Sequence, residues 1–314
     1  YRGYDSSGLA LLAEDGKLKR YRAAGKLNNL KCVRGVLDHT SNIGIGHTRW
    51  ATHGAPVEVN AHPHQDCDSK ISVVHNGIVE NFSDLKSQLI NNGHVFESDT
   101  DAEVIPHLIE AKLREGVPLD KSVALVAKSL KGSNSAVVLH KDNPGELIAF
   151  RSGNSAGLVI GHGNGSMFVS SDVVALSRHT TQVCYLNTNE LALITADEAT
   201  YMNFELAPIT KNVECVGRDV DEVSKGDYEH YMLKEIFDQP QSIRRTISEK
   251  TINSSDGIAS IKPFLLSDDA NRIDRVVLLG MGTSYNAALI GRRFFEDLAK
   301  IPSEADNSSE FRYR

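Results

Sequence analysis

A run of short predicted strands across residues 135–204 constrains the possible folds more than any other feature of the chain. Apolar and β-branched stretches alternate there with turn sequences, such as Asp-Asn-Pro-Gly at residues 142–145. Strands this close in sequence pair as antiparallel hairpins, because a parallel pair needs a crossover of about a dozen residues or more. The strands are expected at residues 136–140, 146–150, 158–161, 167–170, 183–186, 191–195 and 200–204.

Helical patterns precede these strands. A β-branched segment at residues 71–75 ends at Asn76-Gly77, and apolar residues then recur at helical spacing over residues 79–92. Residues 119–130 predict another helix. Helices grouped in the middle of many hairpin strands indicate an α+β fold built in layers, rather than alternating βαβ units.

A third helix is predicted between those two. Thr100 and Glu103 have the spacing of a capping box, which places Asp101 in the first turn of a helix that runs toward Arg114. Pro106 lies deep in this helix. Because proline has no N–H to donate, the pattern predicts a kink or a later helix start.

The pattern changes again after the hairpin strands. Residues 228–237 and 239–248 are predicted as two helices around Pro240, and a strand at 275–279 leads through a tight loop into a helix at 286–299. A strand, a loop and a helix in this order begin a parallel α/β domain. We therefore expect a first domain at residues 1–216, a polar linker at 217–227 and the beginning of a second domain at 228–314.

Composition and charge exclude several classes of function. The 314 residues suffice for two cores, and the net charge of −7 offers no basic stripe for nucleic acid. No apolar run reaches the roughly 18–20 residues that span a membrane. The four cysteines form no close pair, which indicates reduced thiols and a cytoplasmic location: Cys32, Cys67, Cys184 and Cys215.

Three polar blocks supply the candidate site. Residues 46–54 (GHTRWATHG) hold an arginine, two histidines, two threonines and the only tryptophan of the chain between glycines. Nearly every side chain in this block can hydrogen-bond, which a packing helix or strand does not need. Residues 73–78 and 97–101 add an asparagine amide and acidic groups. Together the blocks offer a cation that grips a carboxylate, amide donors and an acid, which suits the binding of an amino acid.

Two simpler interpretations compete with this one. Asn76-Gly77 is the commonest signal of a hairpin turn, although the helical spacing after it argues against a returning strand. His62 and His64, with Cys67, have the composition of a metal site. No closing pair of ligands follows at zinc-finger spacing, so a loop shaped by Pro63 is preferred and no metal is expected.

The motifs GHTRWATHG, HNGI and SDTDAE lie in or overlap these three blocks, and they follow YRGYDS at residues 1–6. In this order they resemble the glutaminase half of the glutamine–fructose-6-phosphate aminotransferases. The resemblance resumes at residues 231–236 (YMLKEI), 282–286 (GTSYN) and 309–314 (SEFRYR). It implies a four-layer αββα amino-terminal-nucleophile domain of the class II glutamine amidotransferases, followed by the start of an α/β SIS domain that handles sugar phosphates.

The resemblance also implies residue roles. Arg49 would bind the α-carboxylate of glutamine and Asp101 its α-ammonium, with Thr52, His53 and Gly77 lining the same pocket. Asn76 and Gly77 would form the oxyanion hole, and Arg2 would lie near the active site. Trp50 matches a residue that gates the passage of ammonia, although a lone tryptophan is more often part of a core.

The second domain is predicted to bind a phosphate group. Residues 280–285 resemble a dinucleotide-binding loop, but Tyr285 replaces its third glycine, so no cofactor is expected. Hydroxyl groups at a helix amino terminus suit a phosphate monoester. The resemblance places Thr283 and Ser284 in a sugar-phosphate pocket.

The implied activity transfers the amide nitrogen of glutamine to fructose 6-phosphate and yields glucosamine 6-phosphate, in a homodimer formed through the SIS domain. The class uses an amino-terminal cysteine nucleophile, whereas this chain opens at Tyr1, inside a family motif, and stops at Arg314. A fragment is therefore expected, which binds glutamine without hydrolysing it. Two alternatives remain: another class II glutamine amidotransferase, which the 282–284 loop disfavours, and a non-catalytic sensor of glutamine or sugar phosphate.

Overall fold

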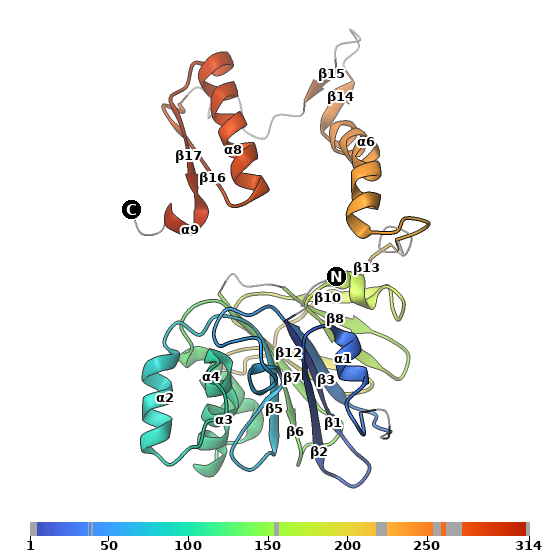
Figure 1. Ribbon diagram of the computed structural model, residues 1–314, viewed down its shortest axis with the longest axis vertical. Helices are drawn as coiled ribbons and strands as arrows, with labels where there is room; N and C mark the ends of the chain where they lie inside the picture. Colours follow the sequence, from blue (N-terminus) through green and yellow to red (C-terminus); the bar gives the residue numbers. More distant parts are fainter. Residues whose placement is uncertain are drawn as a thin grey trace. The chain divides into compact units, whose positions relative to one another are not determined.

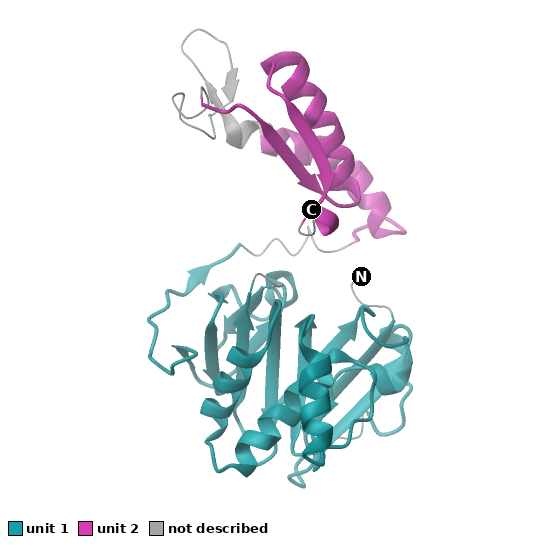
Figure 2. Cartoon of the chain, turned by 90° about the vertical axis from the view of Figure 1, so that its left-hand side faces the viewer, with its two compact units in different colours: residues 1–224 teal, residues 225–314 magenta. Residues whose placement is uncertain are grey.

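The computed structural model describes residues 5–36, 38, 40–153, 157–217, 225–253, 259–261 and 272–311. The chain divides into two compact units, Tyr1–Ser224 and Lys225–Arg314, coloured separately in Figure 2. Most of the linker predicted at residues 217–227 lies outside the described residues, and so does Arg2. Within the described part of the chain, no helix combines the length and apolarity that a membrane crossing requires.

The first unit contains a six-stranded antiparallel sheet in the order β12-β11-β7-β6-β5-β4. Hydrogen-bonded hairpins account for most of its neighbours, as the turn sequences predict. The predicted strands that fall in this sheet are confirmed to within two residues at either end. Its strands are β4 (His64–Gln65), β5 (Ile71–Gly77), β6 (Asn134–His140), β7 (Leu147–Ser152), β11 (Glu190–Ile194) and β12 (Ala199–Asn203).

Two smaller antiparallel sheets complete the strand content of the first unit. One has the order β13-β10-β8-β9, from β8 (Leu158–His162), β9 (Met167–Ser170), β10 (Gln182–Leu186) and β13 (Glu214–Cys215). The other has the order β2-β1-β3, from β1 (Ser6–Leu12), β2 (Leu18–Ala24) and β3 (Gly44–Arg49). The sequence patterns did not predict this second sheet.

Helices cover one face of the six-stranded sheet, as Figure 1 shows. They are α2 (Phe82–Asn91), α3 (Val104–Arg114) and α4 (Leu119–Ser129). Ile105 and Ile109 of α3 share a buried core with Ile71 and Val73 of β5. This packing follows from the apolar stripe of each helix, which must be buried against another element.

The opposite face of the six-stranded sheet packs against the two smaller sheets. Val74 and Leu139 share a second core there with Ala10 and Ile160. The outer layer is thin: α1 (Leu27–Lys31) packs on the β1–β2 side, and the short helix η3 (Val173–Leu176) packs near β8 and β10. The α+β fold in αββα layers is thus confirmed.

The helix near Asp101 differs from the predicted one. A 3-10 turn, η2 (Asp101–Glu103), precedes α3, so Pro106 falls in the first turn of α3, where its missing N–H leaves no gap. The prediction of a capping box between Thr100 and Glu103 is wrong. Glu103 accepts hydrogen bonds from the backbone N–H groups of Glu97 and Ser98 at 2.7 Å, instead of reaching back to Thr100.

The second unit contains a parallel pair, β16 (Val276–Gly280) and β17 (Ser303–Asn307), with α8 (Thr283–Phe294) between them in sequence. The predicted beginning of a parallel α/β unit is confirmed. One helix, α6 (Tyr231–Lys250), replaces the two predicted around Pro240 and contains that proline. The remaining short elements among the described residues are η1 (Glu58–Asn60), β14 (Thr251–Asn253), β15 (Ala259–Ile261), the π-helix η4 (Phe295–Ala299) and α9 (Ser308–Phe311).

Candidate active site

A cavity of about 910 Å³ lies in the first unit where β3 approaches β5 and β6. The three polar blocks of the sequence meet in its wall. Of the residues predicted to act on glutamine, those that line it are Arg49, Thr52, Asn76, Gly77 and Asp101, and Trp50 lines it as well. His53 lies beside it, with Nδ1 at 3.8 Å from Oδ1 of Asp101.

Arg49 ends strand β3, although the polar side chains of residues 46–54 do not suit a packing strand. Side chains alternate between the two faces of a strand, so residues two apart share a face. His47 and Arg49 therefore both face the cavity that they line. A strand can serve a site when it forms an edge, as β3 does in its sheet.

The Arg49 guanidinium is buried and shapes the loop that follows it. It donates hydrogen bonds to the carbonyl oxygens of Gly54 and Ala55, each at 3.1 Å, and to that of His53. Burial lowers the pKa of Arg49, while Asp101 and Asp5 oppose the shift. Arg49 thus brings a positive charge to the cavity wall and fixes the backbone of residues 53–55.

Asp101 lies at the start of η2 with its carboxylate buried. Its Oδ2 accepts a hydrogen bond from the backbone N–H of Val79 at 2.7 Å. This hydrogen bond holds the Asp101 carboxylate against the segment that follows Gly77, and so keeps it close to Asn76 and Gly77. The wall then carries a cation from β3 and an anion from η2, the two charges that a zwitterionic amino acid requires.

Asn76 and Gly77 lie at the end of β5 and pair with Ser135 and Asn134 of β6. The hairpin-turn interpretation is therefore wrong. Gly77 has a φ of 131°, and a Cβ added there would stand 2.0 Å from the carbonyl oxygen of Ser133. Only glycine fits this position, which brings the backbone of residue 77 to the cavity wall.

The amide of Asn76 is oriented by a histidine. Nε2 of His47 lies 2.8 Å from Oδ1 of Asn76. An amide oxygen has no proton, so His47 donates and the Asn76 oxygen accepts. The NH₂ group of Asn76 is the part that remains as a donor. In this orientation Asn76 can donate to an oxygen on which negative charge develops.

His47 belongs to a neutral histidine group, defined here as His47, His62, His64 and His75. Rings of His47 and His62 lie 4.4 Å apart, and those of His62 and His64 lie 4.6 Å apart. Loss of solvent lowers the pKa of His47 to about 4 and that of His64 to about 3. Burial also lowers the pKa values of His62 and His75. The sequence patterns did not predict that these four histidines lie together, although the alternation of residues 44–49 places His47 on the same strand face as Arg49.

Trp50 is 66% exposed at the cavity, so the interpretation of this residue as part of a core is wrong. Thr52 is exposed as well, and His53 is partly exposed. Arg49, Asp101 and the β5 residues thus form the fixed wall, and residues 50–53 form its solvent-facing rim.

None of the cysteines lines the cavity. All are free thiols, with Cys184 buried in β10 and the other three exposed. Cys67 has a distinctive neighbourhood, because Nδ1 of His94 and Nδ1 of His107 lie 3.8 Å and 3.6 Å from its sulfur.

Thr283 and Ser284 open helix α8 in the second unit, and both are exposed. The preceding Gly280 allows the tight loop, because a Cβ there would lie 2.5 Å from the carbonyl carbon of Ser284. Gly282 precedes the helix with a φ of 59°. The loop therefore presents hydroxyl groups and backbone N–H groups at a helix amino terminus, an arrangement that suits an anion.

Comparison with known proteins places these observations in a family context. Residues 47–178 match the model of a glutamine amidotransferase domain. Over 314 residues the chain is 41% identical to a glutamine–fructose-6-phosphate aminotransferase (isomerizing) from Pyrococcus horikoshii and 42% identical to one from Gloeobacter violaceus. Each alignment covers 100% of this chain and 50% of the relative, so the chain spans about half the length of the curated relatives it matches.

A solved structure shares the fold. The glutamine phosphoribosylpyrophosphate amidotransferase from B. subtilis, complexed with ADP and GMP, superposes with a TM-score of 0.56 and 19% sequence identity. The match covers 97% of this chain and 60% of that chain. At this identity the likeness supports the fold and carries no statement about substrates.

Proposed function

We propose that this chain, a relative of the glutamine–fructose-6-phosphate aminotransferases with a glutamine amidotransferase domain, uses its cavity to bind glutamine and release the amide nitrogen as ammonia. One observation carries the proposal: Arg49, Asn76, Gly77 and Asp101 come from separate sequence blocks and line a single cavity. No packing requirement explains a buried cation, a buried acid and an oriented amide around one hollow.

Glutamine binds by its two charges in this proposal. The α-carboxylate lies against Arg49, and the α-ammonium lies against Asp101. Because three carbonyl oxygens already hold the Arg49 guanidinium, the cation is placed before the ligand arrives. Thr52 and His53 contribute polar contacts from the exposed side.

The amide of glutamine is cleaved by nucleophilic attack. The nucleophile is the amino-terminal cysteine of this enzyme class, whose own α-amine accepts the thiol proton. The tetrahedral oxyanion is stabilised by the Asn76 NH₂ and the Gly77 N–H, ammonia leaves, and water hydrolyses the glutamyl thioester. The start of β1 supports this placement, because the Asp5 N–H lies 3.4 Å from the carbonyl oxygen of Arg49, beside the cavity.

The whole enzyme then delivers ammonia to fructose 6-phosphate and forms glucosamine 6-phosphate in the cytoplasm. Trp50 controls the release of ammonia from the cavity, consistent with its exposure there. Thr283 and Ser284 bind the sugar phosphate, and the second unit provides a homodimer contact. Arg2 assists in the active site.

A matched pair of proteins tests the glutaminase proposal. Residues 1–314 alone are expected to bind glutamine without releasing glutamate, since none of the described cysteines lines the cavity. A chain extended to begin with the class cysteine is expected to release glutamate, and its cysteine-to-alanine variant is not. Glutamate release by residues 1–314 above a heat-inactivated control would assign the nucleophile elsewhere.

A second candidate function keeps the glutaminase and changes the acceptor of ammonia. It is the alternative that the sequence leaves open, another class II glutamine amidotransferase, and the loop at residues 282–284 disfavours it. Assays of the extended full-length enzyme with fructose 6-phosphate or phosphoribosylpyrophosphate separate the two. Glutamate release that fructose 6-phosphate stimulates and phosphoribosylpyrophosphate does not would support the first function.

A further inference from the structure

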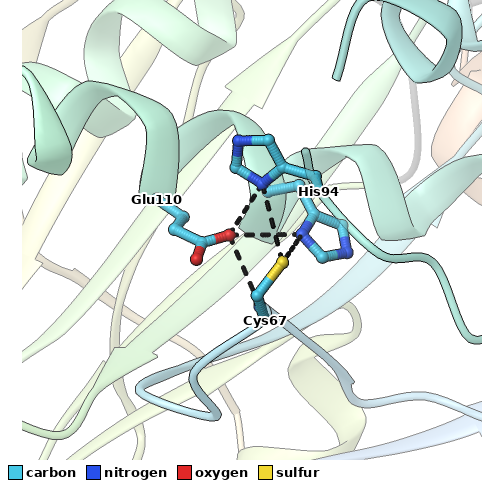
Figure 3. A group of neighbouring side chains, drawn as sticks. Cys67, His94 and Glu110 are labelled. Atoms are coloured by element: carbon cyan, nitrogen blue, oxygen red, sulfur yellow. Dashed lines mark hydrogen bonds and ion pairs between the residues drawn. The ribbon is translucent and has the colours of Figure 1, made fainter. Parts of the chain in front are cut away.

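A second polar cluster lies in the first unit, away from the cavity. Figure 3 shows the side chains of Cys67, His94 and Glu110 turned toward one another, and His107 completes the group. One potential ligand atom from each residue lies within 4.8 Å of all the others. The four residues are called the ligand cluster below, and none of them lines the cavity.

Three separate segments supply the ligand cluster. Cys67 lies in the turn between β4 and β5, and His94 follows helix α2. His107 and Glu110 lie one turn apart on helix α3, so they share a helix face. The spacing of these four residues in sequence matches no zinc-finger pattern. The sequence alone therefore suggested His62 and His64, which are nearer in sequence, as the candidate co-ligands of Cys67.

Both imidazole rings present Nδ1 to the same point. Nδ1 of His94 lies 2.8 Å from Oε2 of Glu110, and Nδ1 of His107 lies 3.3 Å from that oxygen. The Cys67 sulfur accepts a hydrogen bond from the backbone N–H of Val95 at 3.4 Å, which fixes its position. A cysteine sulfur, two imidazole nitrogens and a carboxylate oxygen thus converge.

We propose that Cys67, His94, His107 and Glu110 form a tetrahedral site for a divalent metal ion, with Zn²⁺ as the preferred occupant. Zinc is bound in proteins by this combination of sulfur, nitrogen and oxygen ligands. A soft thiolate disfavours Mg²⁺ and Ca²⁺, which take oxygen ligands. On binding, the proton of the Cys67 thiol and any proton on the two Nδ1 atoms are released to solvent, and the sulfur and nitrogens bond to the ion.

The distances suit such an ion. Bond lengths of about 2.0–2.3 Å imply ligand atoms about 3.3–3.6 Å apart in a tetrahedron. The sulfur–nitrogen distances of 3.8 Å and 3.6 Å and the 3.3 Å nitrogen–oxygen distance lie near this range. The 2.8 Å contact between His94 and Glu110 would open by about 0.5 Å as the ion replaces a proton.

The surroundings of the ligand cluster match those of a metal site. Nε2 of His107 lies 3.7 Å from Oε1 of Glu103 and has no hydrogen-bond partner among the described residues. A metal on Nδ1 would place the proton on Nε2, where it can be donated to this carboxylate. Arg114 binds the other oxygen of Glu110 and leaves Oε2 for the ion.

The competing arrangement has no metal. In it, His107 is doubly protonated and bridges Glu103 and Glu110 by its two nitrogens, and Cys67 remains a neutral thiol. This arrangement uses the histidine and the two acids. It also gives His94 a hydrogen bond to Glu110 at 2.8 Å. It assigns no role to the Cys67 sulfur, which lies 3.8 Å and 3.6 Å from the two Nδ1 atoms, whereas a metal ion uses all four groups.

Metal analysis of the purified 314-residue chain tests the proposal. After growth with zinc and dialysis against a weak chelator, we expect about one zinc per chain by mass spectrometry. The Cys67→Ala and Glu110→Gln variants are expected to lose it. The Cys215→Ala variant is the matched control, because Cys215 is also an exposed free thiol and lies outside the ligand cluster.

Cobalt substitution gives a second readout that does not depend on stability. Co²⁺ added to the zinc-free chain should produce the intense visible absorption of a tetrahedral site and a sulfur-to-cobalt charge-transfer band. Both should be lost in Cys67→Ala and kept in Cys215→Ala. Arg114→Gln should weaken zinc binding by about tenfold, as expected for a residue that holds a ligand.

Two results would overturn the proposal. One is a wild-type chain, folded by circular dichroism, that neither retains zinc nor develops the cobalt spectrum. The other is zinc retained equally by Cys67→Ala, which would place the metal elsewhere. Neither result bears on glutamine binding, because the ligand cluster and the cavity share no residue.

Discussion

The neutral histidine group and the ligand cluster lie in the same unit and use the same residue type, but their neighbours differ. His47 and His75 contact amide oxygens, of Asn76 at 2.8 Å and of Asn134 at 3.0 Å. His64 contacts the hydroxyl of Thr100 at 3.0 Å. In the ligand cluster, both histidines contact the carboxylate of Glu110 and lie near a thiol.

The difference shows that the partner atom decides what a buried histidine does. Burial keeps the pKa of His47 low, so the neutral ring acts as a fixed hydrogen-bond donor that orients the amide of Asn76. A carboxylate and a thiol are anionic ligands that can share a cation with imidazole nitrogens. The predictions that follow test the role of the neutral histidine group and of the cavity it supports.

The largest effect is expected from acid. Burial lowers the folded-state pKa of His64 to about 3, below the ordinary histidine value of 6.5, so the unfolded chain binds the proton first as pH falls. The stabilisation is fully present above pH 6.5 and is lost progressively toward pH 3, at up to about 1.4 kcal/mol per pH unit for each such histidine. His47, with a folded-state pKa of about 4, contributes a loss of stability in the same direction down to about pH 4.

Urea unfolding between pH 7 and pH 4 measures this loss, in excess chelator so that metal release does not contribute. The His64→Gln variant should have a shallower dependence of unfolding free energy on pH, whatever its stability at pH 7. The exposed His179 offers the control, and His179→Gln should leave the slope unchanged. Equal slopes in all three proteins would mean that His64 is not held neutral.

The next largest effect is expected at the amide that His47 orients. In the extended, active chain, Asn76→Ala and Asn76→Gly should each lower turnover by about 10²–10³ with little change in KM, because the contact strengthens only as charge develops. Steady-state kinetics with a thermal melt measure this. A folded Asn76→Gly enzyme with near wild-type turnover would remove Asn76 from the oxyanion hole.

Arg49→Lys should weaken glutamine binding by about 1–3 kcal/mol, because lysine keeps the charge and loses the planar fork. The same fork holds the carbonyl oxygens of Gly54 and Ala55, so the rim should also loosen. Calorimetry on Arg49→Lys and Asp101→Asn checks the prediction. Unchanged affinity in both variants would show that glutamine does not bind between these charges.

The smallest effect is expected from the positioning residue His47. His47→Ala should lower turnover about fivefold to tenfold with unchanged KM, since one hydrogen bond of about 1 kcal/mol orients Asn76. His47→Gln keeps a donor and should recover part of the loss. If His47→Ala raised KM and left turnover unchanged, the histidine would serve binding rather than orientation of the amide.

Some of this protein could be predicted from its sequence. Turn residues such as those at 142–145 fix hairpins locally, so the predicted strands of the six-stranded sheet agree with the observed ones to within two residues. The two-residue strand β4 was not predicted. The strand β3 was missed because its polar side chains do not resemble a packing strand. Its identity as a strand depends on pairing with β1, a contact between segments that are distant in sequence.

The candidate site divides in the same way. The sequence by itself determined the chemistry of Arg49, Asn76, Gly77 and Asp101, because their side chains and their order in three blocks are local properties. Only the tertiary structure decided that these blocks share one cavity, that His47 orients Asn76, and that Cys67 lies beside His94 and His107. The physical reason is that hydrogen bonds and metal ligation act over a few ångströms, and burial of the apolar faces of β5 and α3 sets which distant residues come that close.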